Sequence, residues 1–312
     1  MKKIILLSAI LFFNFASSQT KSTTYKVKES DVATNLKTLT SDAMEGREAG
    51  TPGIEKAAVF LENYFKSISV KSYFSTYRDT LTTFSKTTCN IVGYIEGNDP
   101  VLKNEFVVLG GHYDHIGITD EAVNGDKINN GANDDASGVT AVLEMARYFS
   151  QSKSNKRSIL FVCFSGEEKG LLGSKSLAKK LKKKNFNLYT MLNFEMIGVP
   201  MARDYTAYIT GFDKSNMAAK INEYAGNNLI GFLEAEKSYE LFSRSDNYSF
   251  YNEFRVPSQT VCTFDFENFE FYHQPGDEFE KMDIPHMTSF IQKMVPVVEK
   301  MTNSTTKEIK LN

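Results

Sequence analysis

The sequence predicts an α/β fold in which one central, mostly parallel β-sheet is covered by helices on both faces. Two short runs, 106–109 and 159–164, consist of apolar residues alone, as expected for central strands that are buried on both sides. Segments of strand length alternate with segments of helical periodicity, which is typical of parallel sheets. With 312 residues, 41% of them hydrophobic and 24% charged, the chain has ample material for a core.

The first half of the chain begins with helices and continues into strands. The helix at 54–68 is indicated by Ala57, Ala58, Leu61 and Phe65, which recur on one side of a helix. We expect, in order, a helix at 32–39, a glycine-rich loop at 44–53, a helix at 54–68, β-prone residues at 70–88, and strands at 89–95 and 106–109.

The second half repeats the alternation. Val139, Val142 and Leu143 have the spacing of a helix that packs on a core. We expect a polar loop at 117–130, helices at 137–149, 171–184, 216–225 and 284–301, and strands at 159–164, 189–194, 205–209 and 259–264. Neither a linker nor an internal repeat divides the chain, so the sequence predicts a single globular domain.

The two ends of the chain differ from the rest. Lys2 and Lys3 precede a mostly apolar run at 4–15, and small residues follow at 16–18, which is the pattern of a secretory signal peptide. The run is shorter than the roughly 20 residues of a membrane span. We therefore expect a signal peptide at 1–18, export to a periplasm or out of the cell without a stable membrane anchor, the globular domain at 19–301 and a polar tail at 302–312.

Charge argues against one class of partner, and the cysteines argue against a disulfide framework. The formal net charge of −2 offers no basic surface, so nucleic acid is not expected as a partner. Cys89, Cys163 and Cys262 each lie in an apolar, strand-like run. We interpret them as buried free thiols rather than as a disulfide framework.

Polar clusters follow three of the predicted elements. They read G-G-H-Y-D-H, N-G-A-N-D-D-A-S-G and F-S-G-E-E-K-G, and their metal-binding side chains are His112, Asp114, Asp134, Asp135, Glu167 and Glu168. Sites of α/β sheets lie at the carboxyl ends of the strands. Imidazole and carboxylate are ligands of zinc, which keeps a position open for water when it is catalytic. The clusters therefore predict one metal site.

Each cluster also has a structural interpretation. Asp114 could accept a hydrogen bond from the ring of His112, as is usual beside a metal-bound histidine. Aspartates also favour helix N-termini, so we expect one of Asp134 and Asp135 to cap a helix while the small residues around them allow close backbone approach. A carboxylate there can bridge two cations.

Two neighbouring acids follow a buried strand at Glu167 and Glu168. Burying both is costly unless they are paired or bind metal. Neighbouring side chains on an extended segment point apart, so one can bind metal while the other acts as a general base. A surface turn is the simpler alternative for this E-E-K sequence.

Further candidates lie later in the chain. Glu195 ends an apolar run, and His273 has Asp277 four residues on as a possible orienting partner. His115 is a candidate for lining the site. His286 begins the last predicted helix and is expected to be structural.

The motifs H-x-D, N-D-D-A-S-G, G-E-E, N-F-E-M-I-G and Y-H-x-x-x-D occur in this order. Together they resemble the co-catalytic zinc aminopeptidases, a family that also contains glutaminyl cyclases, glutamate carboxypeptidase II and the transferrin receptor. G-R-E-A-G-T-P-G at 46–53 and T-C-N-I-V-G-Y-I-E-G at 88–97 are similar to the family's entry into its catalytic domain. The resemblance extends from Gly46 to Met301 and implies a zinc-exopeptidase-like fold.

The resemblance also implies roles for single residues. Two zinc ions would be bridged by Asp134, with His112 and Glu195 on one ion and Glu168 and His273 on the other. Glu167 would be the general base and Asp114 a residue behind the ligands. A cis peptide bond is implied between Asp134 and Asp135. The implied substrates are peptides with a free N-terminus.

Two positions depart from the family's pattern. Glu195 stands where aspartate is more usual, which affects its reach or denticity. S-D-N at 245–247 stands where S-D-H is common, which affects local substrate contacts.

Three other functions compete with the aminopeptidase. A single-zinc glutaminyl cyclase is disfavoured by the paired Glu167 and Glu168 and the five-ligand set. A non-catalytic binding module would have lost ligands. A carboxypeptidase-type metallopeptidase usually inserts a dimerisation domain, for which the 78 residues between Glu195 and His273 leave little room.

Overall fold

The computed structural model describes residues 25–82 and 84–312. The expected signal peptide at 1–18 lies outside the described residues. The central sheet has the strand order β1-β3-β7-β4-β8-β11-β9-β10, with β2 beside β3. Its strands are β1 (Lys71–Ser72), β2 (Arg78–Thr80), β3 (Cys89–Ile95), β4 (Phe106–His112), β7 (Ser158–Phe164), β8 (Leu188–Glu195), β9 (Ala207–Ile209), β10 (Ile230–Gly231) and β11 (Ser258–Cys262).

The middle of the sheet is parallel and its flanks are antiparallel. Strands β7, β4, β8 and β11 run in one direction, whereas β3 and β9 run against their inner neighbours. All side chains of β7 and all but the first of β4 are buried. The predicted mixed, mostly parallel sheet is therefore confirmed.

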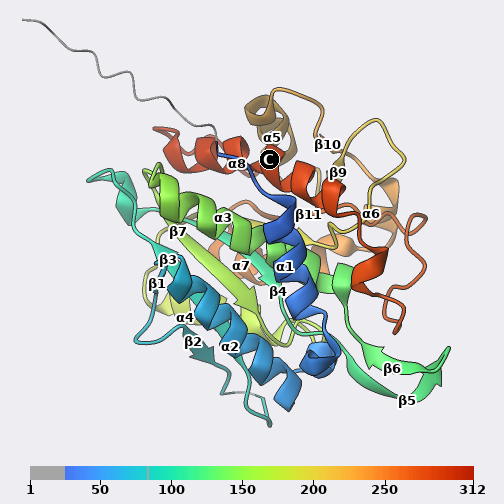
Figure 1. Cartoon of the computed structure of the whole chain (residues 1–312). Coiled ribbons are helices and arrows are strands. Elements are labelled where there is room, and N and C mark those ends of the chain that lie inside the picture. The colour runs from blue at the N-terminus through green and yellow to red at the C-terminus, as the bar shows by residue number, and fades with distance from the viewer. Residues whose placement is uncertain (1–24, 83) are drawn as a thin grey trace, which may run out of the picture.

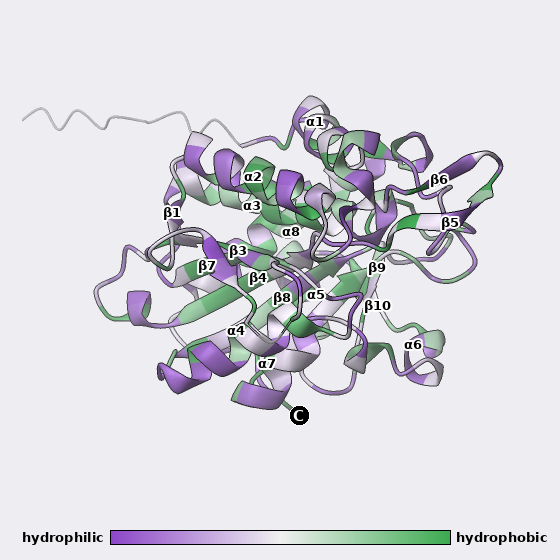
Figure 2. Ribbon diagram, turned by 90° about the horizontal axis from the view of Figure 1, so that it is seen from below, coloured by the Kyte–Doolittle hydropathy of each residue, from purple (hydrophilic) through white to green (hydrophobic). Residues whose placement is uncertain are grey.

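Helices cover both faces of the sheet (Figures 1 and 2). One face carries α1 (Glu29–Leu39), α2 (Pro52–Ser67), α3 (Gly138–Ser152) and α8 (Ile284–Asn303). The other carries α4 (Leu172–Lys183) and α7 (Asn247–Phe254). Alternation along β4 produces the two cores, because Val107 and Leu109 pack with the first group and Val108 with the second.

Smaller elements surround this framework. Helix α5 (Met217–Ala225) packs beside α8 and β10, and α6 (Glu234–Ser238) follows β10. Short 3-10 turns are η1 (Asp42–Arg47), η2 (Leu102–Asn104), η4 (Leu241–Ser243) and η5 (Phe279–Lys281), and the segment η3 (Ala132–Ser137) is a π-helical turn with a kink.

The polar loop expected at 117–130 is wrong, because these residues form a hairpin. Strands β5 (Gly117–Val123) and β6 (Asp126–Asn129) pair with each other and project from the body (Figure 1). Asn124 and Gly125 connect them with φ angles of 54° and 88°, as a two-residue hairpin turn requires. The Asn-Gly pair was the signal in the sequence, but a charged, poorly alternating run masked it.

The C-terminal tail docks on the domain although its composition is polar. Ile309 is buried, and its N–H donates to the hydroxyl of Tyr189 (2.9 Å). Leu311 forms a β-bridge with Ser215. Glu308 and Lys310 add hydrogen bonds to Tyr224 and Asn216, so polar contacts and one buried apolar side chain together hold the tail.

The three cysteines are buried and unpaired, as expected. Among the residues that the structure describes, no helix is both long and apolar enough to cross a membrane.

Candidate active site

The candidate residues converge at the carboxyl ends of the parallel strands. His112 is the last residue of β4 and Glu195 the last of β8. Glu167 and Glu168 follow β7, and His273 lies in the segment after β11. Asp134 comes from the kinked segment that leads into α3. Parallel pairing of β7, β4 and β8 brings these ends together, as expected for a sheet of this kind.

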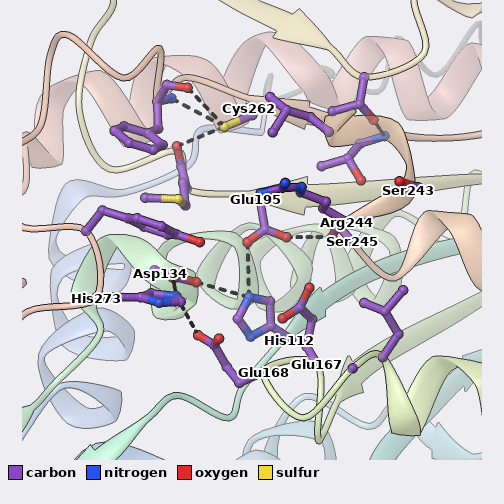
Figure 3. Close-up of a pocket in the computed structure, with 18 of the residues that line it drawn as sticks. His112, Asp134, Glu167, Glu168, Glu195, Ser243, Arg244, Ser245, Cys262 and His273 are labelled. Atoms are coloured by element: carbon purple, nitrogen blue, oxygen red, sulfur yellow. Dashed lines mark hydrogen bonds and ion pairs between the residues drawn. The ribbon is translucent and has the colours of Figure 1, made fainter. Parts of the chain in front are cut away.

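Asp134 lies between two histidines (Figure 3). Its Oδ1 is 3.1 Å from Nε2 of His112, and its Oδ2 is 3.1 Å from Nε2 of His273. Each histidine faces a second acid, since His112 Nε2 is 3.0 Å from Oε1 of Glu195 and His273 Nε2 is 3.2 Å from Oε1 of Glu168. The result is two sets of candidate metal ligands, each with one histidine and one glutamate, that share the carboxylate of Asp134.

The spacing of these donor atoms suits small cations. Tetrahedral zinc with ligands at roughly 2.0–2.1 Å separates neighbouring donor atoms by about 3.3 Å. The measured separations of 3.0–3.2 Å within each group are close to this value. The nitrogen and carboxylate donors are also those that zinc prefers. The residues present therefore fit a pair of zinc ions.

Asp135 is a less suitable ligand than Asp134, although it also lies near His112 and Glu195. Its carboxylate accepts hydrogen bonds from the backbone N–H groups of His112 (3.1 Å), Gly138 (3.0 Å) and Met196 (3.0 Å). A Cβ atom at Gly138 would lie 2.4 Å from Oδ1 of Asp135, so this glycine permits the close approach. Asp135 therefore binds the N–H of the first residue of α3, although the N-cap position itself is Ser137, and the peptide bond between Asp134 and Asp135 is cis.

Asp114 supports the site in a different way from the one expected. The nearest acceptor to Nδ1 of His112 is the backbone carbonyl of Asp114 (3.0 Å), while the carboxylate lies 3.8 Å away. The carboxylate instead accepts from the backbone N–H groups of Glu167 (3.2 Å) and Glu168 (3.3 Å). Asp114 thus fixes the turn that presents both glutamates, because those two amides need an acceptor once they are buried.

The expected pairing of Asp277 with His273 is wrong. The buried Asp277 carboxylate accepts from the backbone N–H groups of Asn133 (2.7 Å) and Asp134 (3.0 Å). It therefore fixes the backbone that carries Asp134. The motif spacing placed Asp277 near the site, but only tertiary contacts decided which group it binds.

Arg47 provides a buried positive charge beneath the cluster. Its guanidinium donates to the carbonyls of Tyr113 (2.7 Å), Leu39 (2.7 Å), Asn130 (2.6 Å) and Gly131 (2.9 Å). Burial lowers its pKa to about 10, against the opposing effect of the nearby aspartates, so it stays charged at neutral pH. In the sequence Arg47 lies in a glycine-rich loop, and no local pattern there indicates that its side chain is buried.

The carboxylates stabilise positive charge on both histidines. Burial opposes protonation of His112, but Glu195 and Glu167 raise its pKa well above the usual value. Burial also opposes protonation of His273, yet hydrogen bonds to Asp134 and Glu168 raise its pKa to about 10. A cluster that holds protons on two imidazoles would stabilise divalent cations in the same place.

Glu167 differs from the acids that pair with histidine. It lines the cavity above the cluster, and its backbone N–H is held by Asp114. Burial raises the pKa of its carboxyl well above the usual value, and the charge of His112 opposes this effect. Its side chain has no hydrogen bond within 25–82 and 84–312, so it is free to act on a molecule in the cavity.

The cavity over the cluster has a volume of ≈ 470 Å³, within the usual range for small-molecule sites. Its floor contains the acids and the two histidines. One wall is apolar and aromatic, formed by Met196, Phe264, Phe266 and Tyr272. Tyr272 stacks on the ring of His273 with centroids 4.0 Å apart. The aromatic run at 264–272 therefore contributes to the site as well as to the core.

The two departures from the motif pattern have different consequences. Oε2 of Glu195 accepts a hydrogen bond from the hydroxyl of Ser245 (2.7 Å) while Oε1 faces His112, so the longer side chain has a second anchor. Asn247 is buried and hydrogen-bonded to the carbonyls of Phe242 and Ser258. It supports the backbone and is absent from the cavity lining.

Comparison with known proteins identifies the family. The model of Peptidase family M28 matches residues 90–298, which contain every candidate ligand. The chain belongs to Peptidase family M28.

Solved structures share the fold of this M28 protein. The LapA aminopeptidase of Legionella pneumophila superposes with a TM-score of 0.70 at 23% identity, over 90% of this chain and 73% of that one. BSAP, a zinc aminopeptidase from Bacillus subtilis, superposes with a TM-score of 0.69 at 16% identity, over 90% of this chain and 97% of that one. The glutaminyl cyclase of Porphyromonas gingivalis superposes with a TM-score of 0.69 at 16% identity, over 89% of this chain and 100% of that one. At these identities the likeness establishes the fold alone.

Curated relatives match over a shorter region. A probable zinc metalloprotease of Pyrenophora tritici-repentis is 42% identical over 117 residues, which is 37% of this M28 chain and 26% of that protein. The match thus spans about a quarter of the relative's length.

His115 is the site residue whose role the sequence left most open. The ring is fully buried, its Nδ1 lies 3.0 Å from Oε1 of Glu168, and its Nε2 has no hydrogen-bond partner in the described part of the M28 chain. With the proton on Nδ1, His115 donates to Glu168 and orients that carboxylate. The D-H pair at 114–115 was the only signal for it in the sequence.

We expect Arg47→Met to destabilise the fold by about 3–5 kcal/mol, because it removes a buried charge and takes a donor from four carbonyls, of which only that of Gly131 keeps another donor, the N–H of Ala136. Arg78→Met is the matched control, since Arg78 pairs with Glu55 and Glu62 near the surface, where such pairs contribute about 1 kcal/mol or less. Chemical denaturation of both variants measures the difference. Equal losses in the two variants would contradict the structural role of Arg47.

We expect His115→Leu to weaken zinc binding by about 10–100-fold, as loss of a ligand's hydrogen-bond partner commonly does. His115→Asn should keep most of the affinity, since its side-chain amide can donate from the place of Nδ1. Competition with a chromogenic chelator measures both. If Asn and Leu variants lose zinc equally, donation to Glu168 is not the role of His115.

Proposed function

We propose that the protein is an exported zinc aminopeptidase that hydrolyses the bond after the first residue of peptides. The observation that carries this proposal is the position of Asp134, whose two oxygens face two histidines that each have an acid of their own. Such an arrangement suits two metal ions that share one carboxylate. Membership of the family and the aminopeptidases among the similar structures agree with it.

His112, Glu195 and Asp134 would hold one zinc, and His273, Glu168 and Asp134 the other. When bound, two zinc ions activate a water molecule and polarise the carbonyl of the scissile bond. Asp114, Asp135 and Asp277 hold backbone N–H groups and so keep the ligands in place. The two-metal centre distinguishes this proposal from a single-zinc glutaminyl cyclase.

Glu167 would move the proton during the reaction. Its carboxylate lines the cavity beside the ligands and has no hydrogen bond to any residue that the structure describes, so it can accept the proton of the attacking water. It then delivers this proton to the departing amine, as general acid–base catalysis requires.

The cavity would orient the peptide by its charge and its apolar wall. A free α-amino group is attracted to the acidic floor, which limits cleavage to the first residue. The first side chain would then lie against Met196, Phe264 and Tyr272. We therefore propose a preference for apolar or aromatic first residues.

Aminoacyl chromogenic amides, tested with one N-terminal glutaminyl peptide, separate the candidate functions. We expect release from leucyl and phenylalanyl amides to exceed release from glutamyl amides, to be lost on chelation and to return with zinc. Formation of a pyroglutamyl product without amide cleavage would identify a cyclase. Cleavage only of peptides with a blocked amino end would indicate a carboxypeptidase. A protein that acts on none of these substrates and contains no metal would be a binding module.

Glu167→Gln tests the general base. We expect turnover to fall by roughly 10²–10⁴-fold while the zinc content is unchanged, because the substitution keeps the shape of the side chain but removes its basic oxygen. Elemental analysis of the purified variant is the control for metal loss. Near-normal turnover with full zinc content would exclude Glu167 from this role.

A further inference from the structure

Arg244 differs from the other arginines because its side chain has no partner among the described residues. Four of the other arginines pair with carboxylates, Arg47 donates to backbone carbonyls and Arg255 lies over the ring of Tyr251. Across 25–82 and 84–312, no ion pair, side-chain hydrogen bond or aromatic ring engages the guanidinium of Arg244. Arg244 is exposed, as a positive charge without a partner usually is, and it also lines the cavity of the candidate active site.

The backbone of Arg244 is held near the ligand cluster by its neighbour. The hydroxyl of Ser245 donates to Oε2 of Glu195, so the backbone of Arg244 lies one residue from the ligand cluster. In Figure 3, Arg244, Ser243 and Ser245 lie on one side of Glu195 and His273 lies on the other.

A second cation, Lys175 from α4, lines the same cavity, and its Nζ donates to the carbonyl of Gly170 (3.0 Å). Among the residues that line the cavity, the acids cluster at the metal-binding floor, whereas Arg244 and Lys175 come from other segments. The cavity therefore offers a bound molecule both negative and positive groups. A peptide has the matching charges, with an amino group at one end and a carboxylate further along.

The guanidinium group suits a carboxylate better than any other common peptide group. Its planar donors can bind both carboxylate oxygens at once. An extended peptide advances about 3.3–3.6 Å per residue. With its first residue at the metal ligands, a peptide would thus bring its second or third residue within reach of a long side chain anchored beside Ser245.

We propose that Arg244 forms a subsite for a peptide carboxylate on the part of the substrate that departs after cleavage. The orientation of the peptide rests on the proposed aminopeptidase function. The carboxylate is either the free C-terminus of a di- or tripeptide or the side chain of an acidic residue, and both present the same chemistry to Arg244. The subsite selects short or acidic peptides over long neutral ones.

Equilibrium binding tests this subsite without relying on turnover. Isothermal titration calorimetry would use zinc-loaded protein with Glu167→Gln, so that the peptides stay intact. The probes are Leu-Gly and its amide, which differ in the terminal carboxylate, and the amides of Leu-Glu and Leu-Gln, which differ in the side-chain carboxylate. Each pair is measured with Arg244 intact, with Arg244→Gln and with Arg255→Gln, an exposed arginine outside the cavity.

We expect Leu-Gly, Leu-Glu amide or both to bind about 10-fold more tightly than the matched peptide that lacks the carboxylate, as a charged hydrogen-bonded pair allows. This difference should vanish in Arg244→Gln and persist in Arg255→Gln. A difference for Leu-Gly alone identifies the C-terminus as the source, and one for Leu-Glu amide alone identifies the acidic side chain.

Equal binding of acidic and neutral peptides, binding of none of them, or a difference that survives Arg244→Gln would each overturn the subsite. Hydrolysis of the Leu-Gly amide by the unsubstituted protein is measured in parallel. Carboxylate-dependent binding without hydrolysis would keep the subsite and reject the aminopeptidase. Hydrolysis without carboxylate-dependent binding would keep the aminopeptidase and reject the subsite.

Discussion

The structure depends on placing many carboxylates at one end of the sheet. Asp114, Asp134, Asp135 and Asp277 are all at most 2% exposed, and ionised groups are not buried without compensation. Compensation comes from three sources, which are the guanidinium of Arg47 below, the imidazoles beside Asp134, and backbone N–H groups. The loops after β4 and before α3 are arranged around this requirement.

The aspartates divide into supporting residues and a candidate ligand by what they bind. Asp114, Asp135 and Asp277 accept from backbone amides, so their oxygens are occupied and their loops are fixed. Asp134 accepts from no backbone amide in the described chain and instead faces two histidines. Rigid supporting contacts of this kind let a metal site keep its ligands in position.

The cavity above the site combines unlike surfaces in a small space. Its floor is acidic, one wall is aromatic, and its rim carries two cations. A peptide with a free amino end, an apolar first side chain and a carboxylate could satisfy all three at once. Specificity would then come from several moderate contacts rather than from one deep pocket.

The sequence by itself determined the fold class, the strand ends that form the site and the set of residues near it, because hydrophobic periodicity and motif spacing are local properties. Tertiary structure alone decided which backbone groups the supporting aspartates bind. Apart from Gly138, the partners of Asp135 and Asp277 lie 23 to 144 positions away, and no local pattern reveals them. The same holds for Arg47 and His115, whose roles come from loops that meet only in the folded chain. The direction of a side chain depends on the backbone that surrounds it, and that backbone is assembled from distant segments.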